Sequence, residues 1–385
     1  MGQISLSLGV RQNLLALQST ADLLADTQNR LATGKKVNSA LDNPNSFFTA
    51  SGLNNRANDL NNLLDDMGQG VQTIKAADQG ITAITSLVES AKAKANQALQ
   101  SQSQYERKTF AAQYNDLLGQ IEALAKDAGY KGKNLLGGAG NDLTVNFNED
   151  NTSKITVLAV NYTDTSLTTG LNLADLTAGS AATGTITLTA GTATTALTTG
   201  DTLVSDGEFA DGDVLTFTDG NGFELGQLTV DTTTTVQDLI DKLDGFNGVS
   251  ASLATTDLSI SADFDLSISS SSASFNSGSD LDIDATDSGF ATDAAINNVI
   301  TSINTSLGNL RSQASTFGTN LSTVEIRQDF TKTLIDTLET GAGLLTLADT
   351  NKEGANLLAL QTRQQLASAS LSFASQADQN VLSLF

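Results

Sequence analysis

Cysteine, histidine and tryptophan are absent from this 385-residue chain, and proline occurs only once, at Pro44. Without cysteine the chain can form no disulfide, no thiolate metal site and no cysteine nucleophile. Without histidine it lacks the commonest zinc ligand and the commonest general base, and Ser-His-Asp chemistry is excluded. The composition therefore argues against an enzyme, and we expect no metal and no cofactor.

Long apolar runs are missing as well. No stretch of 18 apolar residues occurs, so no segment is expected to insert into a membrane. Residues 1–11 lack the basic segment and following apolar run of a secretory signal. A protein secreted by a route that needs no such signal would have the same appearance.

Acidic charge is concentrated in the middle of the chain. Residues 1–140 carry 13 Lys/Arg and 12 Asp/Glu, residues 141–290 carry 2 and 23, and residues 291–385 carry 5 and 8. With a net charge of −23, a groove for nucleic acid is not expected. Because like charges repel, the middle should face water while the two nearly neutral ends can pack closely.

Both ends show the 4,3 spacing of a coiled coil. One seam lies within residues 10–31, before a break at Gly34, and the other within residues 357–385. Two such helices alone form a thin pair that buries few residues, so we expect both ends to fold when copies of the chain pack together. The residues predicted to be buried in this self-assembly are Val10, Leu14, Leu17, Ala21, Leu24, Leu31, Leu357, Leu360, Ala367, Leu371, Ala374, Val381 and Phe385.

Longer helices with the same spacing lie inside these ends. They are predicted from about 46 to 100, at about 104–128, and from 296 to 338, where Gly341 and Gly343 are expected to end the last one. Their seams can cover one another within a single molecule. The predicted bundle core comprises Leu53, Leu60, Leu64, Met67, Val71, Ile74, Ile300, Leu307, Leu310, Phe317 and Leu321.

The middle of the chain changes to the period of two that is typical of strands. Residues 141–162 predict a β-hairpin, and six short alternating runs follow between 185 and 269. One helix is expected at Val236–Leu243, with Thr235 as its N-cap. The predicted fold is therefore a mainly α coiled-coil or helical bundle made by the N- and C-terminal segments, with a β-hairpin and an inserted small β-rich (α+β) outer domain.

Three stretches resemble bacterial flagellin. Residues 30–44 read RLATGKKVNSALDNP, like the RL-S-[ST]-G-x-[KR]-[IV]-N-S-A-x-D segment of that family. Residues 355–366 (ANLLALQTRQQL) and 380–385 (NVLSLF) resemble its C-terminus. VRQNLL at 10–15 resembles flagellins of the alphaproteobacterial type, and residues 236–260 are similar to a motif of the variable domain.

The resemblance implies a structural subunit that polymerises into the extracellular flagellar filament, the propeller for swimming. It implies export through the flagellar type III apparatus. The implied partners are the chain itself, other flagellins of the same filament, hook-associated junction and cap proteins, and an export chaperone. The implied division is an inner-tube helix and spoke at 1–44, outer-tube helices and hairpin at 45–165, an acidic surface domain at 166–290, a returning outer-tube helix at 291–340, and a C-terminal inner-tube helix at 341–385.

Two other functions fit parts of the sequence. A hook–filament junction protein of the same family shares the Thr-Gly-Lys-Lys-Val-Asn segment at 33–38. A hydrolase could use two carboxylates of the acidic domain. The run Asp280–Asp287 suggests calcium, but Ala285 stands where an EF-hand needs glycine, so we interpret it as a solvated acidic loop.

Overall fold

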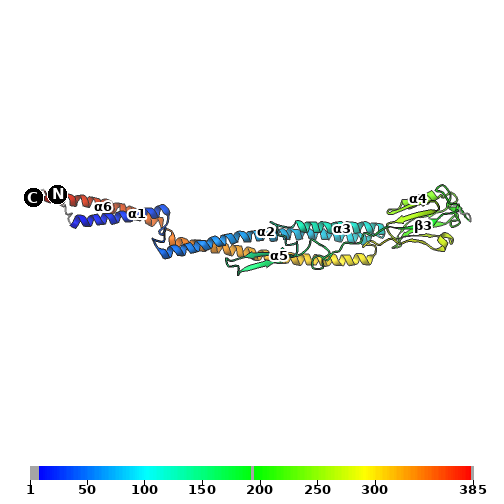
Figure 1. The fold of residues 1–385 in the computed structure, drawn as a ribbon, viewed down its shortest axis with the longest axis horizontal. Coiled ribbons are helices and arrows are strands. Elements are labelled where there is room, and N and C mark those ends of the chain that lie inside the picture. Colours follow the sequence, from blue (N-terminus) through cyan, green and yellow to red (C-terminus); the bar gives the residue numbers. More distant parts are fainter. Residues whose placement is uncertain (1–7, 192–194, 383–385) are drawn as a thin grey trace. The chain divides into compact units, whose positions relative to one another are not determined.

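The computed structural model describes residues 8–191 and 195–382. Long helices occupy both ends of this part of the chain, and the strands lie between them (Figure 1), which confirms the predicted fold class. The helices are α1 (Leu8–Thr33), α2 (Pro44–Gln100), α3 (Gln104–Asp127), α4 (Val236–Asp244), α5 (Asp293–Thr346) and α6 (Thr350–Leu382). The strands are β1 (Leu143–Asn146), β2 (Lys154–Val157), β3 (Ala182–Thr187), β4 (Val214–Asp219), β5 (Glu224–Thr229), β6 (Val249–Ala254), β7 (Asp257–Ala262), β8 (Leu266–Ser270) and β9 (Leu281–Ile283), and two 3₁₀ turns lie at Leu203–Ser205 and Phe275–Gly278.

The chain divides into two compact units. The first contains the described residues up to Gly68, the segment Asn146–Lys154 and the chain from Glu325 onward. The second contains Gln69–Val145 and Ile155–Val324. The five segments predicted from the sequence divide the chain by role in an assembly, and they stay a prediction.

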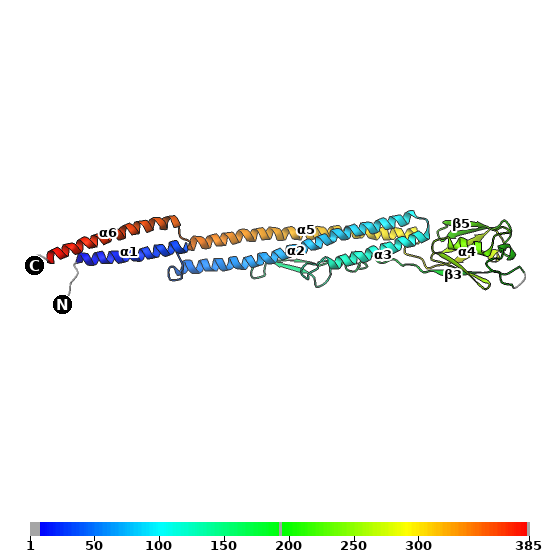
Figure 2. The same ribbon diagram turned by 90° about the horizontal axis from the view of Figure 1, so that it is seen from above.

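In the first unit, α1 packs against α6, and the two helices lie side by side in both ribbon views (Figures 1 and 2). The beginning of α2 packs on the last turns of α5 through buried Ala57, Leu60 and Ile335. Arg56 donates from Nε to Glu149 Oε1 at 2.9 Å, which fixes the tip of the β1–β2 hairpin on α2. The helical seam predicted for residues 53–67 therefore packs against other parts of the same chain.

The helix end predicted at Gly341 and Gly343 is wrong, because α5 continues to Thr346. A Cβ on Gly343 would lie 3.0 Å from Leu347 Cδ1, so the missing side chain leaves room for Leu347 to fold back on the helix. The break comes instead near Ala348, whose N–H donates to the Gly34 carbonyl at 2.9 Å. The break in α1, by contrast, falls at Gly34 as predicted, where φ is +70°.

In the second unit, the later part of α2, α3 and the first part of α5 share one core. Tyr114, Ile84 and Phe317 are among its fully buried side chains, and the Tyr114 and Phe290 rings lie 5.7 Å apart. Arg107 joins two of these segments, since its guanidinium donates to the Ala291 carbonyl at 3.1 Å and pairs with Asp293. The hairpin β1–β2 forms where the sequence predicts it.

The inserted domain consists of two antiparallel sheets, with strand orders β3-β7-β6 and β5-β4-β8-β9. Alternate residues of the strands face a common apolar core that includes Phe217, Leu243 and Ile260. Helix α4 packs on β6 and carries the predicted cap: Thr235 and Asp238 form a complete capping box. The acidic run predicted to be a loop contains β9, because Ile283 is apolar and buried against this core.

Candidate self-assembly surface

The α1–α6 pair is thin, as predicted. The covered side of α1 consists of residues on one face of the helix, of which only Val10 and Thr27 are buried: Val10, Asn13, Leu17, Thr20, Ala21, Leu24 and Thr27. The covered side of α6 is half-buried throughout and consists of Leu357, Leu360, Gln364, Ala367, Leu371 and Ala374. A pair that buries so little apolar area stabilises itself weakly.

Two predicted seam residues do not lie in the covered row. Leu14 and Leu31 remain 37% and 38% exposed, and Asn13 and Thr27 are covered instead. The physical reason is that a single partner helix covers only a narrow strip of α1, while the apolar residues of α1 span a wider one. The helix backbone at Val381 is described without its side chain, and Phe385 lies outside the described residues.

The predicted bundle residues are all removed from solvent to some degree. Leu60, Met67, Val71, Ile74, Leu307, Leu310 and Phe317 are buried. Leu53, Leu64, Ile300 and Leu321 are half-buried.

A second apolar stripe runs along α6, on the side roughly opposite to the one that α1 covers. Its members follow each other at steps of 3, 4, 4, 3, 4 and 4 residues, and all are exposed: Ala355, Leu358, Thr362, Leu366, Ala369, Phe373 and Ala377. An 11-residue repeat of this kind averages 3.67 residues per turn, so the row stays nearly straight along the helix. We call this set the outward stripe.

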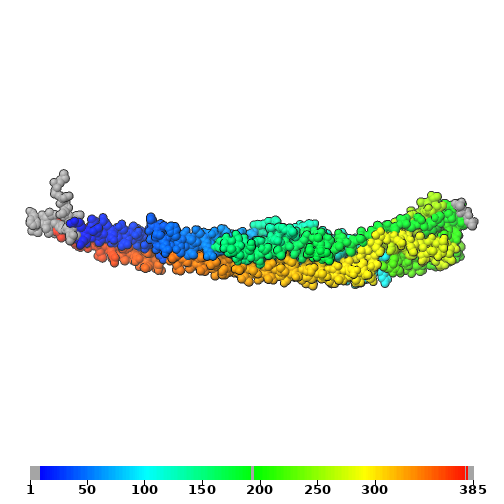
Figure 3. Space-filling model, turned by 60° about the horizontal axis from the view of Figure 1, so that its bottom comes forward, coloured from blue at the N-terminus to red at the C-terminus, as the bar shows by residue number. Residues whose placement is uncertain are grey.

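The large members of the outward stripe are strongly exposed: Leu358 at 66%, Leu366 at 63% and Phe373 at 72%. Helix α1 adds Leu15 at 66% and Leu23 at 49%. In the space-filling view, α1 (blue) and α6 (orange to red) lie along each other, and each presents a continuous strip of surface (Figure 3). These residues were not predicted from the sequence, because only the row with a period of 3.5 residues was followed. They form a second row, with a period of 3.67 residues.

The connectors between the terminal pair and the rest of the first unit are held together. Lys36 donates from its backbone to the Thr346 carbonyl at 2.8 Å and from Nζ to the Leu344 carbonyl at 2.8 Å. Arg30 Nη1 lies 3.6 Å from Glu353 Oε1. These contacts join the chain leaving α1 to the chain entering α6.

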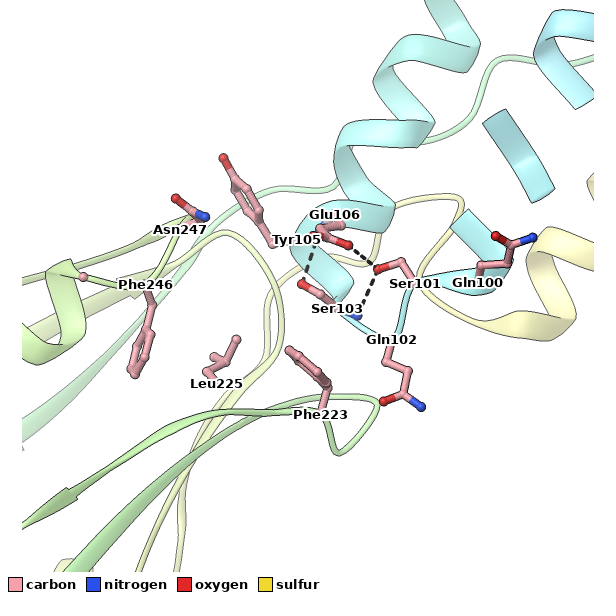
Figure 4. Close-up of a pocket in the computed structure, with 11 residues that line it drawn as sticks. Gln100, Ser101, Gln102, Ser103, Tyr105, Glu106, Phe223, Leu225, Phe246 and Asn247 are labelled. Carbon is pink, nitrogen blue, oxygen red and sulfur yellow. Dashed lines mark hydrogen bonds between the residues drawn. The ribbon is translucent and has the colours of Figure 1, made fainter. Parts of the chain in front are cut away.

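The second unit has an open groove between the start of α3 and the inserted domain, with a volume of about 540 Å³ (Figure 4). Tyr105, Phe223 and Phe246 line it together with a single carboxylate, Glu106. Glu106 Oε2 accepts a hydrogen bond from Ser101 Oγ at 2.6 Å. A two-carboxylate hydrolase needs a second acid across its cleft, and this groove does not supply one.

Within residues 8–191 and 195–382, no three carboxylates are placed so that they could hold a metal ion. None of the helices described there is both long enough and apolar enough to cross a bilayer.

The terminal helices pair with each other and flank an inserted acidic β-rich domain. These features define a helical structural subunit whose exposed apolar surface lies on its terminal helices. The chain belongs to the bacterial flagellin family. Residues 6–141 match the bacterial flagellin N-terminal helical region, and residues 300–385 match the bacterial flagellin C-terminal helical region. Flagellins are structural proteins, so the chain is not an enzyme and the hydrolase hypothesis is rejected.

Individual relatives agree with this family. Flagellin A of Rhizobium meliloti (strain 1021) is 28% identical over 401 aligned residues, which cover 97% of this chain and 96% of that protein. Flagellin FljM of Caulobacter vibrioides is 33% identical over 36% of this chain and 51% of that protein. Such relatives make this a flagellin of the alphaproteobacterial type, and flagellin homologues form the extracellular flagellar filament.

Among solved structures, the crystal structure of Xanthomonas campestris FlgL is 12% identical, covering 76% of this chain and 97% of that one, with a TM-score of 0.29. A score of that size does not establish a shared arrangement of the chain.

Proposed function

We propose that this flagellin is the subunit that polymerises into the filament itself, and that the outward stripe of α6 is the surface through which copies pack. The observation that carries the proposal is that α6 has apolar residues on two opposite sides, of which α1 covers only one. Leu358, Leu366 and Phe373 stay 66%, 63% and 72% exposed in the described part of the single chain. A second copy supplies that cover.

The exposed apolar area of this surface is large enough to contribute substantially to assembly. Full burial of a large apolar side chain contributes about 1.5–3 kcal/mol, and these five side chains are already partly covered, so burying the exposed part of the three large stripe residues, Leu15 and Leu23 contributes about 5–9 kcal/mol. Association costs about 4–15 kcal/mol in lost motion. Losing the three stripe residues of α6 therefore removes more than half of this contribution.

Most of the predicted seam residues lie instead in the α1–α6 contact of the single chain, where they hold the two helices together. Leu14 and Leu31 remain exposed and belong with the proposed surface, and the roles of Val381 and Phe385 stay a prediction.

Charge favours the same arrangement. Residues 141–290 hold 23 acidic against 2 basic residues, while the two ends are close to neutral. Packing the ends together and leaving the acidic domain in water keeps like charges apart and hydrated.

The proposal is tested by replacing Leu358, Leu366 and Phe373 with serine in one chain. Helicity and the melting temperature of the monomer should change little, because these side chains make few contacts there, whereas seeded polymerisation should stop. The matched control replaces Gln361 and Gln379, which are exposed polar residues of the same helix, and should polymerise normally. Normal polymerisation of the triple variant would reject the outward stripe as the assembly surface.

Truncation and seeding separate a filament subunit from a junction protein. Removing Leu357–Phe385 should leave a folded monomer and a non-motile cell. The intact chain alone should extend seeds into long filaments in electron microscopy, whereas a junction protein would not. We also propose, from the family alone, export through the flagellar type III apparatus with a chaperone, and contact with hook-associated junction and cap proteins at the filament ends.

A further inference from the structure

Asparagine followed by glycine occurs at Asn221–Gly222, in the turn between β4 and β5, and at Asn247–Gly248, in the turn between α4 and β6. The side chain of such an asparagine can be attacked by the next backbone nitrogen, because glycine has no Cβ to hinder the approach. Whether the attack takes place depends on how the fold holds the two reacting groups. The two turns hold them differently.

At Asn221 both reacting groups are engaged. The N–H of Gly222 donates to the Asp219 carbonyl at 2.8 Å and closes the turn. The side-chain amide of Asn221 donates from Nδ2 to the Ala291 carbonyl at 3.0 Å. The attack would have to break both hydrogen bonds at this site.

At Asn247 both reacting groups are free. Within residues 8–191 and 195–382, neither the side-chain amide of Asn247 nor the N–H of Gly248 has a hydrogen-bond partner. This turn is closed by Val249, whose N–H donates to the Phe246 carbonyl at 3.2 Å. Gly248 stands at the third position of the turn with a φ of +79°, as a type II turn requires, and its own N–H takes no part in closing it. Asn247 is exposed and lies at the edge of the groove beside α3 (Figure 4).

From this contrast we infer that Asn247 is a site of spontaneous covalent modification, at which the side-chain amide is lost and isoaspartate or aspartate is formed. Asn221, in the same domain, is protected by its two hydrogen bonds. This inference goes beyond the proposed function and does not depend on it.

The reaction needs only water and a base such as hydroxide. The base removes the proton of the Gly248 nitrogen, which attacks Cγ of Asn247 and forms a new C–N bond. The bond from Cγ to the side-chain nitrogen breaks, and that nitrogen takes up a proton and leaves as ammonia. One water molecule then opens the cyclic imide at either of its two carbonyls, which gives isoaspartate or aspartate. Nothing is oxidised or reduced.

The product changes the groove beside α3. Glu106 is the only carboxylate in the lining of this groove, so a modified Asn247 adds a second negative charge. Isoaspartate also adds a methylene group to the main chain within the turn that Val249 closes. The turn has little room for it, since a Cβ on Gly248 would lie 2.5 Å from Tyr105 Cδ2. The hydrogen bond at the start of β6 should therefore be weakened.

The test uses the intact natural chain, incubated at mildly alkaline pH once folded and once in urea. A protease that cleaves before aspartate then releases residues 219–230 and 244–256 as separate peptides, each of which contains a single asparagine. Mass spectrometry measures the conversion of each asparagine. Folding should slow the conversion of Asn221 at least about tenfold more than that of Asn247, because two hydrogen bonds of ordinary strength must break before Asn221 reacts.

The unfolded chain is the matched control, because it gives the rate of each site without the fold. Slowing by the same factor at the two sites would overturn the inference. It would also be overturned if both asparagines convert in urea while Asn247 stays unmodified in the folded chain.

Hydrogen exchange measures the structural consequence. After incubation, the N–H of Val249 should exchange faster in the natural chain, because its hydrogen bond reports local opening of the turn. Asn247→Gln should keep its original exchange rate, since the longer side chain closes the ring much more slowly. Residues 219–223 should exchange equally before and after incubation in both chains. A converted chain with unchanged exchange at Val249 would contradict the expected effect on the turn.

Discussion

Asp265 is a carboxylate in an unfavourable position in the inserted domain. Burial raises its pKa, and the negative charges of Asp287, Asp284 and Asp219 raise it further, against one hydrogen bond from the backbone of Ala285 that lowers it. Its Oδ1 is buried without a hydrogen-bond partner. The folded state therefore binds a proton at Asp265 more tightly than the unfolded chain does.

Asp265→Asn should stabilise the domain at neutral pH and have little effect in acid. With a raised folded pKa, the stability contributed by the protonated carboxyl is complete below the ordinary value of 3.8 and is lost as pH rises through the folded pKa. The amide keeps the uncharged form at every pH. Urea unfolding of both chains between pH 3 and pH 7 measures the difference, which should grow with pH; a gain that is equal at all pH values would contradict this account.

Asp201→Asn is the matched control, since it should have the opposite effect. The N–H and hydroxyl of Thr198 donate to this exposed carboxylate and lower its pKa. Its stabilisation is therefore present above the ordinary value and is lost as pH falls through the folded pKa. The variant should be less stable than the natural chain at neutral pH and equal to it in strong acid.

At the scale of single elements, the glycines of the long helices have two different roles. A Cβ at Gly80 in α2 would lie 2.7 Å from Ala128 Cβ and 2.8 Å from Leu136 Cδ1, so this glycine allows the chain after α3 to approach the helix closely. Gly119 in α3 has nothing within 4 Å of such a Cβ. In a helix interior, glycine costs about 0.5–1 kcal/mol relative to alanine.

Replacing glycine with alanine should thus have opposite effects on stability at Gly80 and Gly119, although both lie in the second compact unit. Gly119→Ala should raise the free energy of unfolding by about 0.5–1 kcal/mol. Gly80→Ala should lower it by about 1–3 kcal/mol, because overpacking outweighs the gain in helix propensity. Denaturant unfolding measures both, and a stabilising Gly80→Ala would show that the approach at Leu136 is not tight.

The elements show what a sequence of this kind can and cannot predict. Helix ends at Gly34 and Gln100, the hairpin and the Thr235 cap were predictable because each depends on local chemistry or on a long periodic row. The end of α5 was not, since it depends on the pairing of Ala348 with Gly34, far away in the chain. Likewise β9 is short and acidic, and only its buried Ile283 marks it as a strand.

The assembly surface could not be predicted from the sequence for a different reason. The seam of period 3.5 identified the α1–α6 pair, but the exposed residues of the outward stripe cannot be recognised until it is known which side α1 covers. Only the structure shows that Leu358 and Phe373 are not covered by α1 and remain exposed.

For the whole molecule, the decisive feature is how the inserted domain joins the helices. Ser180 and Thr286 pair as an antiparallel bridge, with N–H to carbonyl distances of 3.1 and 3.0 Å in the two directions. The chain therefore enters and leaves the domain side by side. The apolar core of the domain, between Ile186 and Ile283, is made by its own residues with Tyr105 of α3 packed against it.

This arrangement predicts that the domain can be removed without loss of assembly. Deleting residues 181–285 and joining Ser180 to Thr286 through Asn-Gly, which favours a two-residue hairpin turn, should leave the remaining pairing intact. The shortened chain should still be helical and should still extend seeds into filaments, because the outward stripe lies in the other compact unit. It should also lose most of the acidic charge, so its filaments should associate laterally at salt concentrations where natural ones stay separate. Electron microscopy across a salt series distinguishes the outcomes. Dispersed filaments in low salt and bundles in higher salt agree with the proposed arrangement. A folded shortened chain that forms no filament would show that the inserted domain itself takes part in assembly.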